Sequence, residues 1–172
     1  MNYIPPTYTI PLKGLVDYTD IMRFCRKNDI QIYVYEFSWK THIVKYGIQH
    51  RYGGNGNDYG ERLYTQIGHM PGWEKQNLKR SQETKKNIDE LINKIESTFN
   101  CKFCKDDITV KIMDYTNAPF ELDNPRAELQ RIEDGLSDLH NSIYGHRPMG
   151  NKTIPTNKKI PLLRSTNLWD WN

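Results

Sequence analysis

The chain lacks the features of a disulfide-built, secreted or membrane protein. It has three cysteines in 172 residues, an odd and low number that does not make a disulfide framework. No stretch approaches the roughly 20 consecutive apolar residues of a membrane-spanning helix. Residues 1–11 lack the basic start and apolar core of a signal peptide. We therefore expect no membrane partner and a reducing, cytoplasmic location.

The chain also has no large excess of charge of either sign. There are 24 lysines and arginines against 21 acidic residues, and the net charge is +3. Mean hydropathy is −0.80, yet apolar residues suffice for one core, which suggests one domain. Because electrostatic steering depends on local clusters of charge, this balance is weak support for a nucleic-acid partner. Evidence for the function must therefore come from short sequence motifs.

Hydrophobic periodicity predicts an α+β fold, a small three-stranded mixed or antiparallel sheet flanked by helices. Two runs of β-branched and aromatic residues predict the strands of an antiparallel hairpin, and apolar residues that recur at helical spacing predict a long helix. The expected elements are an extended arm over 3–12, helices over 17–26, 59–67, 81–99 and 125–142, and strands over 30–37, 43–48 and 107–115. We divide the chain into an N-terminal arm with a short helix (1–29), a central domain (30–151) and a C-terminal arm (152–172).

Chemically useful side chains are concentrated between Ile32 and His69. This stretch carries tyrosines on its first strand, Lys45 on its second, and Arg62 and His69 on or just after its helix. The planar guanidinium of arginine matches the oxygens of a phosphate group. Together these residue types are suited to gripping and attacking a phosphodiester, which points toward nucleic acid.

Two short runs in this stretch resemble the paired motifs of the GIY-YIG nucleases. The first is Tyr33-Val34-Tyr35, where the family has Gly-Ile-Tyr, and the second is Lys45-Tyr46-Gly47. Lysine replaces the first tyrosine of the second motif, as in some restriction-type and phage-type members. From Ile30 to Asn151 the order of elements is similar to the family's β-β-α-α-β-α core.

The resemblance implies a DNA endonuclease that hydrolyses phosphodiester bonds with one Mg²⁺ or Mn²⁺ ion. It implies that DNA is the partner, that a homodimer would serve double-strand cleavage, and that a phage-encoded protein would act in the host cytoplasm. The implied catalytic residues are Tyr35 (alternatively Tyr33), Lys45, Arg62, His69 and the metal ligand Glu133 (alternatively Glu128), with Gly47 and Asn151 in support. Tyr35 is preferred because it precedes Lys45 by ten residues, close to the family's spacing.

Each of these residues also has a plain structural interpretation. A tyrosine packs in a core, a lysine or glutamate is solvated, and an arginine pairs with a neighbouring carboxylate. The alternative function is a non-catalytic nucleic-acid-binding protein on the same scaffold, and a third is an interaction protein unrelated to nucleic acid. The nuclease hypothesis expects Tyr35, Lys45, Arg62 and Glu133 to converge on one concave face.

A separate pair, Cys101 and Cys104, has the CxxC spacing. His140 or His146 would join the two cysteines in a zinc site. A structural zinc site needs four ligands, however. Two buried thiols between a helix and a strand is the simpler interpretation.

Overall fold

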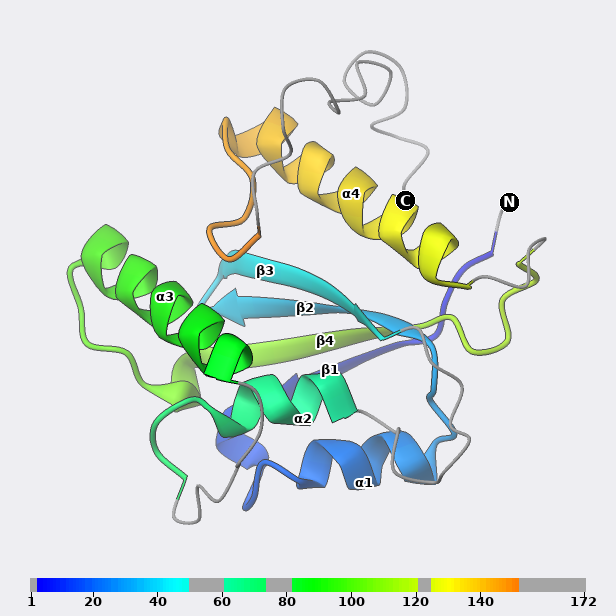
Figure 1. Ribbon diagram of the computed structural model, residues 1–172, viewed down its shortest axis with the longest axis horizontal. Coiled ribbons are helices and arrows are strands. Elements are labelled where there is room, and N and C mark those ends of the chain that lie inside the picture. The colour runs from blue at the N-terminus through cyan, green and yellow to red at the C-terminus, as the bar shows by residue number, and fades with distance from the viewer. Residues whose placement is uncertain (1–2, 50–60, 74–81, 121–124, 152–172) are drawn as a thin grey trace.

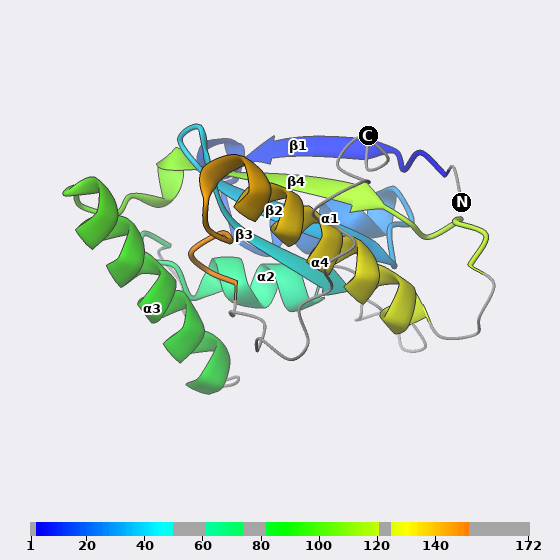
Figure 2. The ribbon, with the colours of Figure 1, turned by 90° about the horizontal axis from the view of Figure 1, so that it is seen from above.

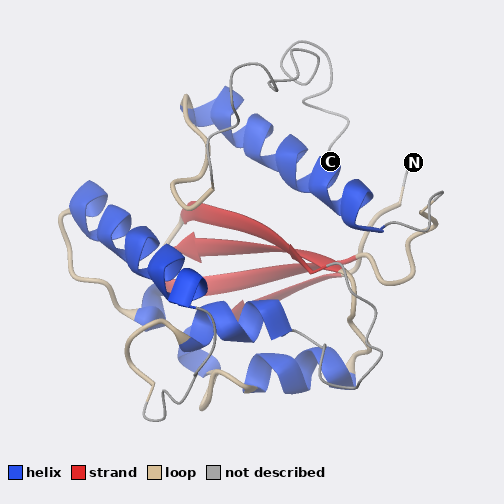
Figure 3. Cartoon of the chain, in the orientation of Figure 1, coloured by secondary structure: helices blue, strands red, loops and turns tan. Residues whose placement is uncertain are grey.

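The computed structural model describes residues 3–49, 61–73, 82–120 and 125–151, with the side chains of all of these except 61 and 62. The fold is α+β, and helices lie on both sides of one sheet (Figures 1 and 3). The strands are β1 (Thr7–Pro11), β2 (Tyr33–Trp39), β3 (His42–Gln49) and β4 (Ile108–Asp114). The helices are α1 (Asp20–Lys27), α2 (Glu61–Gly68), α3 (Gln82–Phe99) and α4 (Pro125–Tyr144), with short 3-10 helices η1 (Leu12–Gly14) and η2 (Lys105–Asp107).

The described sheet has four strands rather than the expected three. Its order is β1-β4-β2-β3, and every pairing is antiparallel. The additional strand, β1, belongs to the segment that we predicted to be an extended arm, and it pairs with β4 from Thr7↔Met113 to Pro11↔Thr109. The prolines of this segment concealed the strand, because proline is tolerated on an edge strand but not in the middle of a sheet.

Two apolar cores lie on opposite faces of the sheet. The larger core joins Tyr33, Tyr35, Phe37 and Trp39 of β2 to apolar residues of α1, α2 and α3. The smaller core joins Val34 and its neighbours to α4. Figure 2 shows α4 on one side of the sheet and α1 and α2 on the other. Alternation along β2 therefore decides which helices each side chain faces.

Most predicted elements are confirmed with small shifts of their ends. Ile108, Val110 and Ile112 are fully buried on one face of β4, as their spacing predicts. The hairpin turn is shorter than the interval between the predicted strands 30–37 and 43–48, since Lys40 and Thr41 alone separate β2 from β3. Lys40 takes the turn's left-handed conformation, with φ of 53°. Within the described residues, no helix is both long enough and apolar enough to cross a membrane.

Candidate functional site

The two resembling motifs face each other across the β2–β3 ladder. Tyr35 pairs with Gly47, so the two residues share one face of the sheet. The ring of Tyr35 lies directly over Gly47, and a Cβ at that position would be 2.7 Å from Cε1 and closer still to Cζ and Oη. Only glycine leaves room for the ring. The glycine of the second motif is thereby explained by the tyrosine of the first.

The hydroxyl of Tyr35 is held by helix α2. Gln66, which is 6% exposed, donates a hydrogen bond from Nε2 to Tyr35 Oη. Tyr35 itself is 1% exposed, and its ring packs 6.2 Å from that of Tyr33 and 5.2 Å from that of Phe37 between ring centroids. Tyr33 and Tyr35 lie on the same face of β2, in the larger core. Both are core residues within the described part of the chain.

Lys45 lies two residues before Gly47 on the edge strand β3. It pairs with Phe37, so it faces the same side as Tyr35, and it is half-buried. The turn after α4 packs closely here, because Gly150 donates its N–H to the carbonyl of Val44 at 2.7 Å. A Cβ at Gly150 would lie 3.0 Å from Cβ of Lys45 and 2.8 Å from the Val44 oxygen. This close approach brings the turn directly against Lys45.

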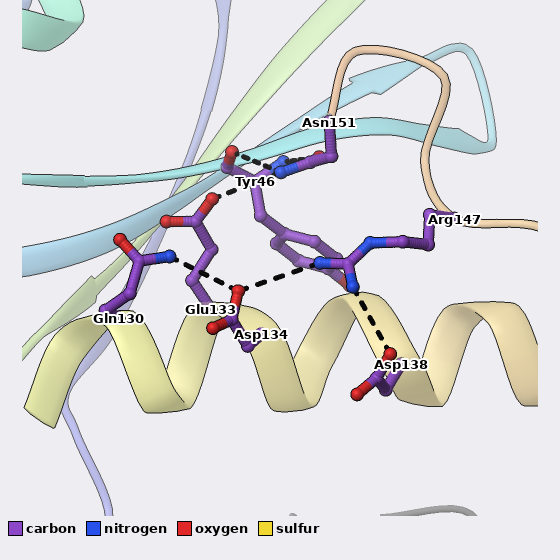
Figure 4. Close-up of polar contacts among 7 residues, drawn as sticks. All are labelled: Tyr46, Gln130, Glu133, Asp134, Asp138, Arg147 and Asn151. Atoms are coloured by element: carbon purple, nitrogen blue, oxygen red, sulfur yellow. Dashed lines mark hydrogen bonds and ion pairs between the residues drawn. The ribbon is translucent and has the colours of Figure 1, made fainter. Parts of the chain in front are cut away.

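The next residue of this turn, Asn151, completes the β3 edge. Its Oδ1 accepts the N–H of Tyr46 at 2.8 Å, and its Nδ2 donates to the Tyr46 carbonyl at 3.0 Å. The side-chain amide thus replaces a neighbouring strand at this position. The same Nδ2 also donates to Glu133 Oε1 at 3.2 Å (Figure 4). Two residues that we predicted separately, Glu133 and Asn151, are therefore in contact with each other, and Asn151 also contacts the second motif.

Charged and polar contacts fasten this turn to α4. Arg147 lies 3.3 Å from Asp138 and 3.7 Å from Asp134, measured between guanidinium nitrogens and carboxylate oxygens (Figure 4). His140 is buried, and its Nδ1 hydrogen-bonds the carbonyl oxygen of His146 at 2.7 Å. Because the turn is held at several points, Asn151 is fixed between α4 and β3.

A tyrosine–carboxylate pair on the α4 face, made by buried Tyr46 and half-buried Glu36, was not among the predicted site residues. Tyr46 is 5% exposed and pairs with Glu36 across the ladder. Burial raises the pKa of the Tyr46 hydroxyl, and the charge of Glu36 and a hydrogen bond to it raise it further. Tyr46 therefore stays protonated at neutral pH. The signal was in the sequence, since Tyr46 is the middle residue of the second motif.

The expected convergence on one face is only partly observed. Tyr35 and Lys45 share the face that α2 and α3 cover, whereas Glu133 comes from α4 on the opposite face. In the described part of the chain, the turn at Gly150 and Asn151 links the two groups around the β3 edge, since it lies against Lys45 and hydrogen-bonds Glu133. Arg62 lies on α2 as predicted, but its side chain is outside the described residues.

The remaining candidates occupy less central positions. His69 follows α2, and its Nε2 is buried without a hydrogen-bond partner in the described structure. Glu128 pairs at 3.6 Å with the largely exposed Arg131 on the same helix. The interpretation of Cys101 and Cys104 as two buried thiols is wrong, because Cys104 is exposed and Cys101 is half-buried. Across the described ranges, no three or more histidine, cysteine and acidic residues are grouped to hold a metal ion.

Comparison of the chain with protein-family models, with curated proteins and with solved structures gave no match. The function is therefore inferred from the residues and contacts of the chain itself.

Proposed function

We propose that the chain is a metal-dependent DNA endonuclease of the GIY-YIG type that works at the β3 edge. The supporting observation is the position of Asn151, whose amide joins Glu133 on α4 to the backbone of Tyr46 in the second motif. Tyr46 is 105 residues from Asn151, and Glu133 is 18 residues from it; the resemblance implied a role for Glu133 and Asn151. Their contact supports a built site.

The roles follow from the chemistry of each side chain. Arg62 binds the scissile phosphate and stabilises the charge that develops on it. Tyr35, once it has lost its phenolic proton to solvent, accepts the proton of the attacking water as a phenolate, and Lys45 lies on the same face of the sheet. His69, close after α2, assists that proton transfer or contacts the phosphate.

Glu133 fits a single divalent ion. A lone carboxylate suits Mg²⁺ or Mn²⁺, which take their other ligands from waters and phosphate oxygens. Asn151 orients the carboxylate through its bond to Oε1. When bound, the ion supplies positive charge that stabilises the leaving oxygen.

A second candidate, a non-catalytic nucleic-acid-binding protein on this scaffold, is favoured by one observation. Tyr35 is 1% exposed, and a general base must come within hydrogen-bond reach of the proton that it accepts. In that case the chain binds DNA with salt-dependent affinity and leaves it intact. The third candidate, an interaction protein, binds no DNA.

Incubation with supercoiled plasmid, with Mg²⁺ or with EDTA, distinguishes these functions. The nuclease cuts only with Mg²⁺, and Arg62→Ala and Glu133→Gln each lower the rate by about 10²-fold or more while circular dichroism shows a folded chain. Glu128→Gln tests the alternative ligand, because it removes from the same helix a carboxylate that is paired with Arg131; a metal site at Glu133 predicts an unchanged rate for this variant. Undiminished cleavage by both Arg62→Ala and Glu133→Gln would refute the proposal. The ratio of nicked to linear plasmid among the products shows whether two copies of the chain cut the two strands together.

A further inference from the structure

Helix α2 carries two consecutive polar residues into the interior of the protein. Thr65 is 8% exposed and Gln66 is 6% exposed, although α2 packs in the apolar layer with Leu63 and Ile67. Burying an amide in such surroundings costs free energy unless its polar atoms are hydrogen-bonded. A leucine or methionine would fill the same space without that cost. Packing alone therefore does not explain glutamine at position 66.

Only half of the Gln66 amide is satisfied. Nε2 donates to Tyr35 Oη, but Oε1 is buried without a hydrogen-bond partner in the described structure, as is Nε2 of His69 three residues later. An unsatisfied buried acceptor costs about 1–3 kcal/mol. Native proteins retain few buried polar groups without a hydrogen-bond partner, so each one needs a physical explanation. Both lie at the C-terminal end of α2, and Gln66 contacts the proposed base directly.

The contact with Gln66 acts on the polar end of Tyr35. The ring packs against Tyr33, Phe37 and Gly47, and Gln66 donates its hydrogen bond to the phenolic oxygen. An N–H that donates to the phenolic oxygen occupies one acceptor direction and so orients the proton. It also favours negative charge on that oxygen, because hydrogen bonds to the charged form stabilise it.

We propose that Gln66 is a positioning residue that orients the Tyr35 phenol and favours its loss of a proton. This inference rests on the proposed function, in which Tyr35 accepts the proton of the attacking water. Gln66 acts through Tyr35 and touches no reacting atom. Its removal should therefore lower the turnover rate more than it weakens DNA binding.

The test uses the full chain labelled with ¹³C at tyrosine Cζ, a signal that reports hydrogen bonding and ionisation of the phenol. Tyr35→Phe identifies the Tyr35 signal among the 11 tyrosines. Gln66→Met removes the donor and keeps the volume, and Gln66→Glu, which cannot donate when ionised, serves if the methionine variant does not fold. Thr65→Val is the control, since it removes the neighbouring buried polar group of the same helix and keeps the amide of Gln66 that donates to Tyr35.

Gln66→Met should move the Tyr35 signal, lower kcat for plasmid cleavage by about 10- to 100-fold with little change in KM, and shift the pH–rate profile upward. Thr65→Val should do none of these. An unmoved Tyr35 signal overturns the proposed contact, whatever the activity. A moved signal with the kcat and pH profile of the control overturns the positioning role. If the unmutated chain does not cut plasmid, the proposed function fails and the catalytic role of Gln66 fails with it, while the Tyr35 signal still reports the contact itself.

Discussion

Replacing Gly47 with alanine tests the packing that joins the two motifs. The new Cβ would lie 2.7 Å from Cε1 of Tyr35 and closer to Cζ and Oη, so the ring must move. The ring is 1% exposed and is packed against other aromatic rings, so it has little space to enter. Overpacking of this kind costs about 1–3 kcal/mol. For a chain of 172 residues, each kcal/mol lowers the Tm by about 2–4 °C.

A double-mutant cycle separates the clash from other effects of the substitution. Tyr35→Leu alone destabilises, because it leaves a cavity where the end of the ring lay. The same cavity accepts the Cβ that the Gly47→Ala substitution adds, so the double variant should be more stable than the sum of the single effects, by about 0.5–3 kcal/mol. Urea unfolding followed by circular dichroism measures all four proteins.

Gly14→Ala is the matched control, because a Cβ there has no heavy atom within 4 Å. It should change stability by no more than about 1 kcal/mol, with stabilisation expected from the reduced freedom of the unfolded chain. If Gly47→Ala is as mild as this control, or if the cycle is additive, the Tyr35 ring does not occupy the space over Gly47.

Two further predictions concern the turn that follows α4. Asn151→Ala leaves the backbone N–H and carbonyl of the buried Tyr46 without their bonds to Asn151, and should lower the free energy of unfolding in urea by about 1–3 kcal/mol. The control, Asn28→Ala, removes one exposed side-chain bond to the Phe24 carbonyl and should lower it less. Equal losses would contradict the role of Asn151 in completing the β3 edge. Burial lowers the pKa of His140, and this outweighs the opposite effect of its bond to the His146 carbonyl. Below about pH 6.5 the unfolded chain therefore takes up a proton that the folded chain does not, and the free energy of unfolding falls as the pH falls. His140→Asn should flatten this dependence in urea titrations between about pH 7 and pH 5, and an unchanged slope would show that His140 does not cause it.

The sequence predicted the elements of the core because their patterns are local. The spacing of Ile88, Leu91 and Ile95 marks the buried side of α3, and the alternation of Ile108, Val110 and Ile112 marks that of β4; all six are buried. The pairing of the two motifs also followed, since a short turn between two strands produces an antiparallel ladder. Strand β1 was not predicted, because the prolines of its segment hide the strand pattern and its partner, β4, is about 100 residues away in the sequence.

The candidate site shows the same difference between what the sequence predicts and what tertiary packing decides. The residue types Tyr35, Lys45, Arg62, Glu133 and Asn151 could be selected from the sequence, because motif spacing and element order are properties of the chain. Which face of the sheet α4 covers is decided by the packing of two separate cores, and this placed Glu133 opposite Tyr35. The contacts of Asn151 with Tyr46, 105 residues apart, and of Gln66 with Tyr35, 31 residues apart, exist only once the sheet and helices have assembled. Sequence alone thus determined the chemistry available to the chain, and tertiary packing decided which of those groups meet.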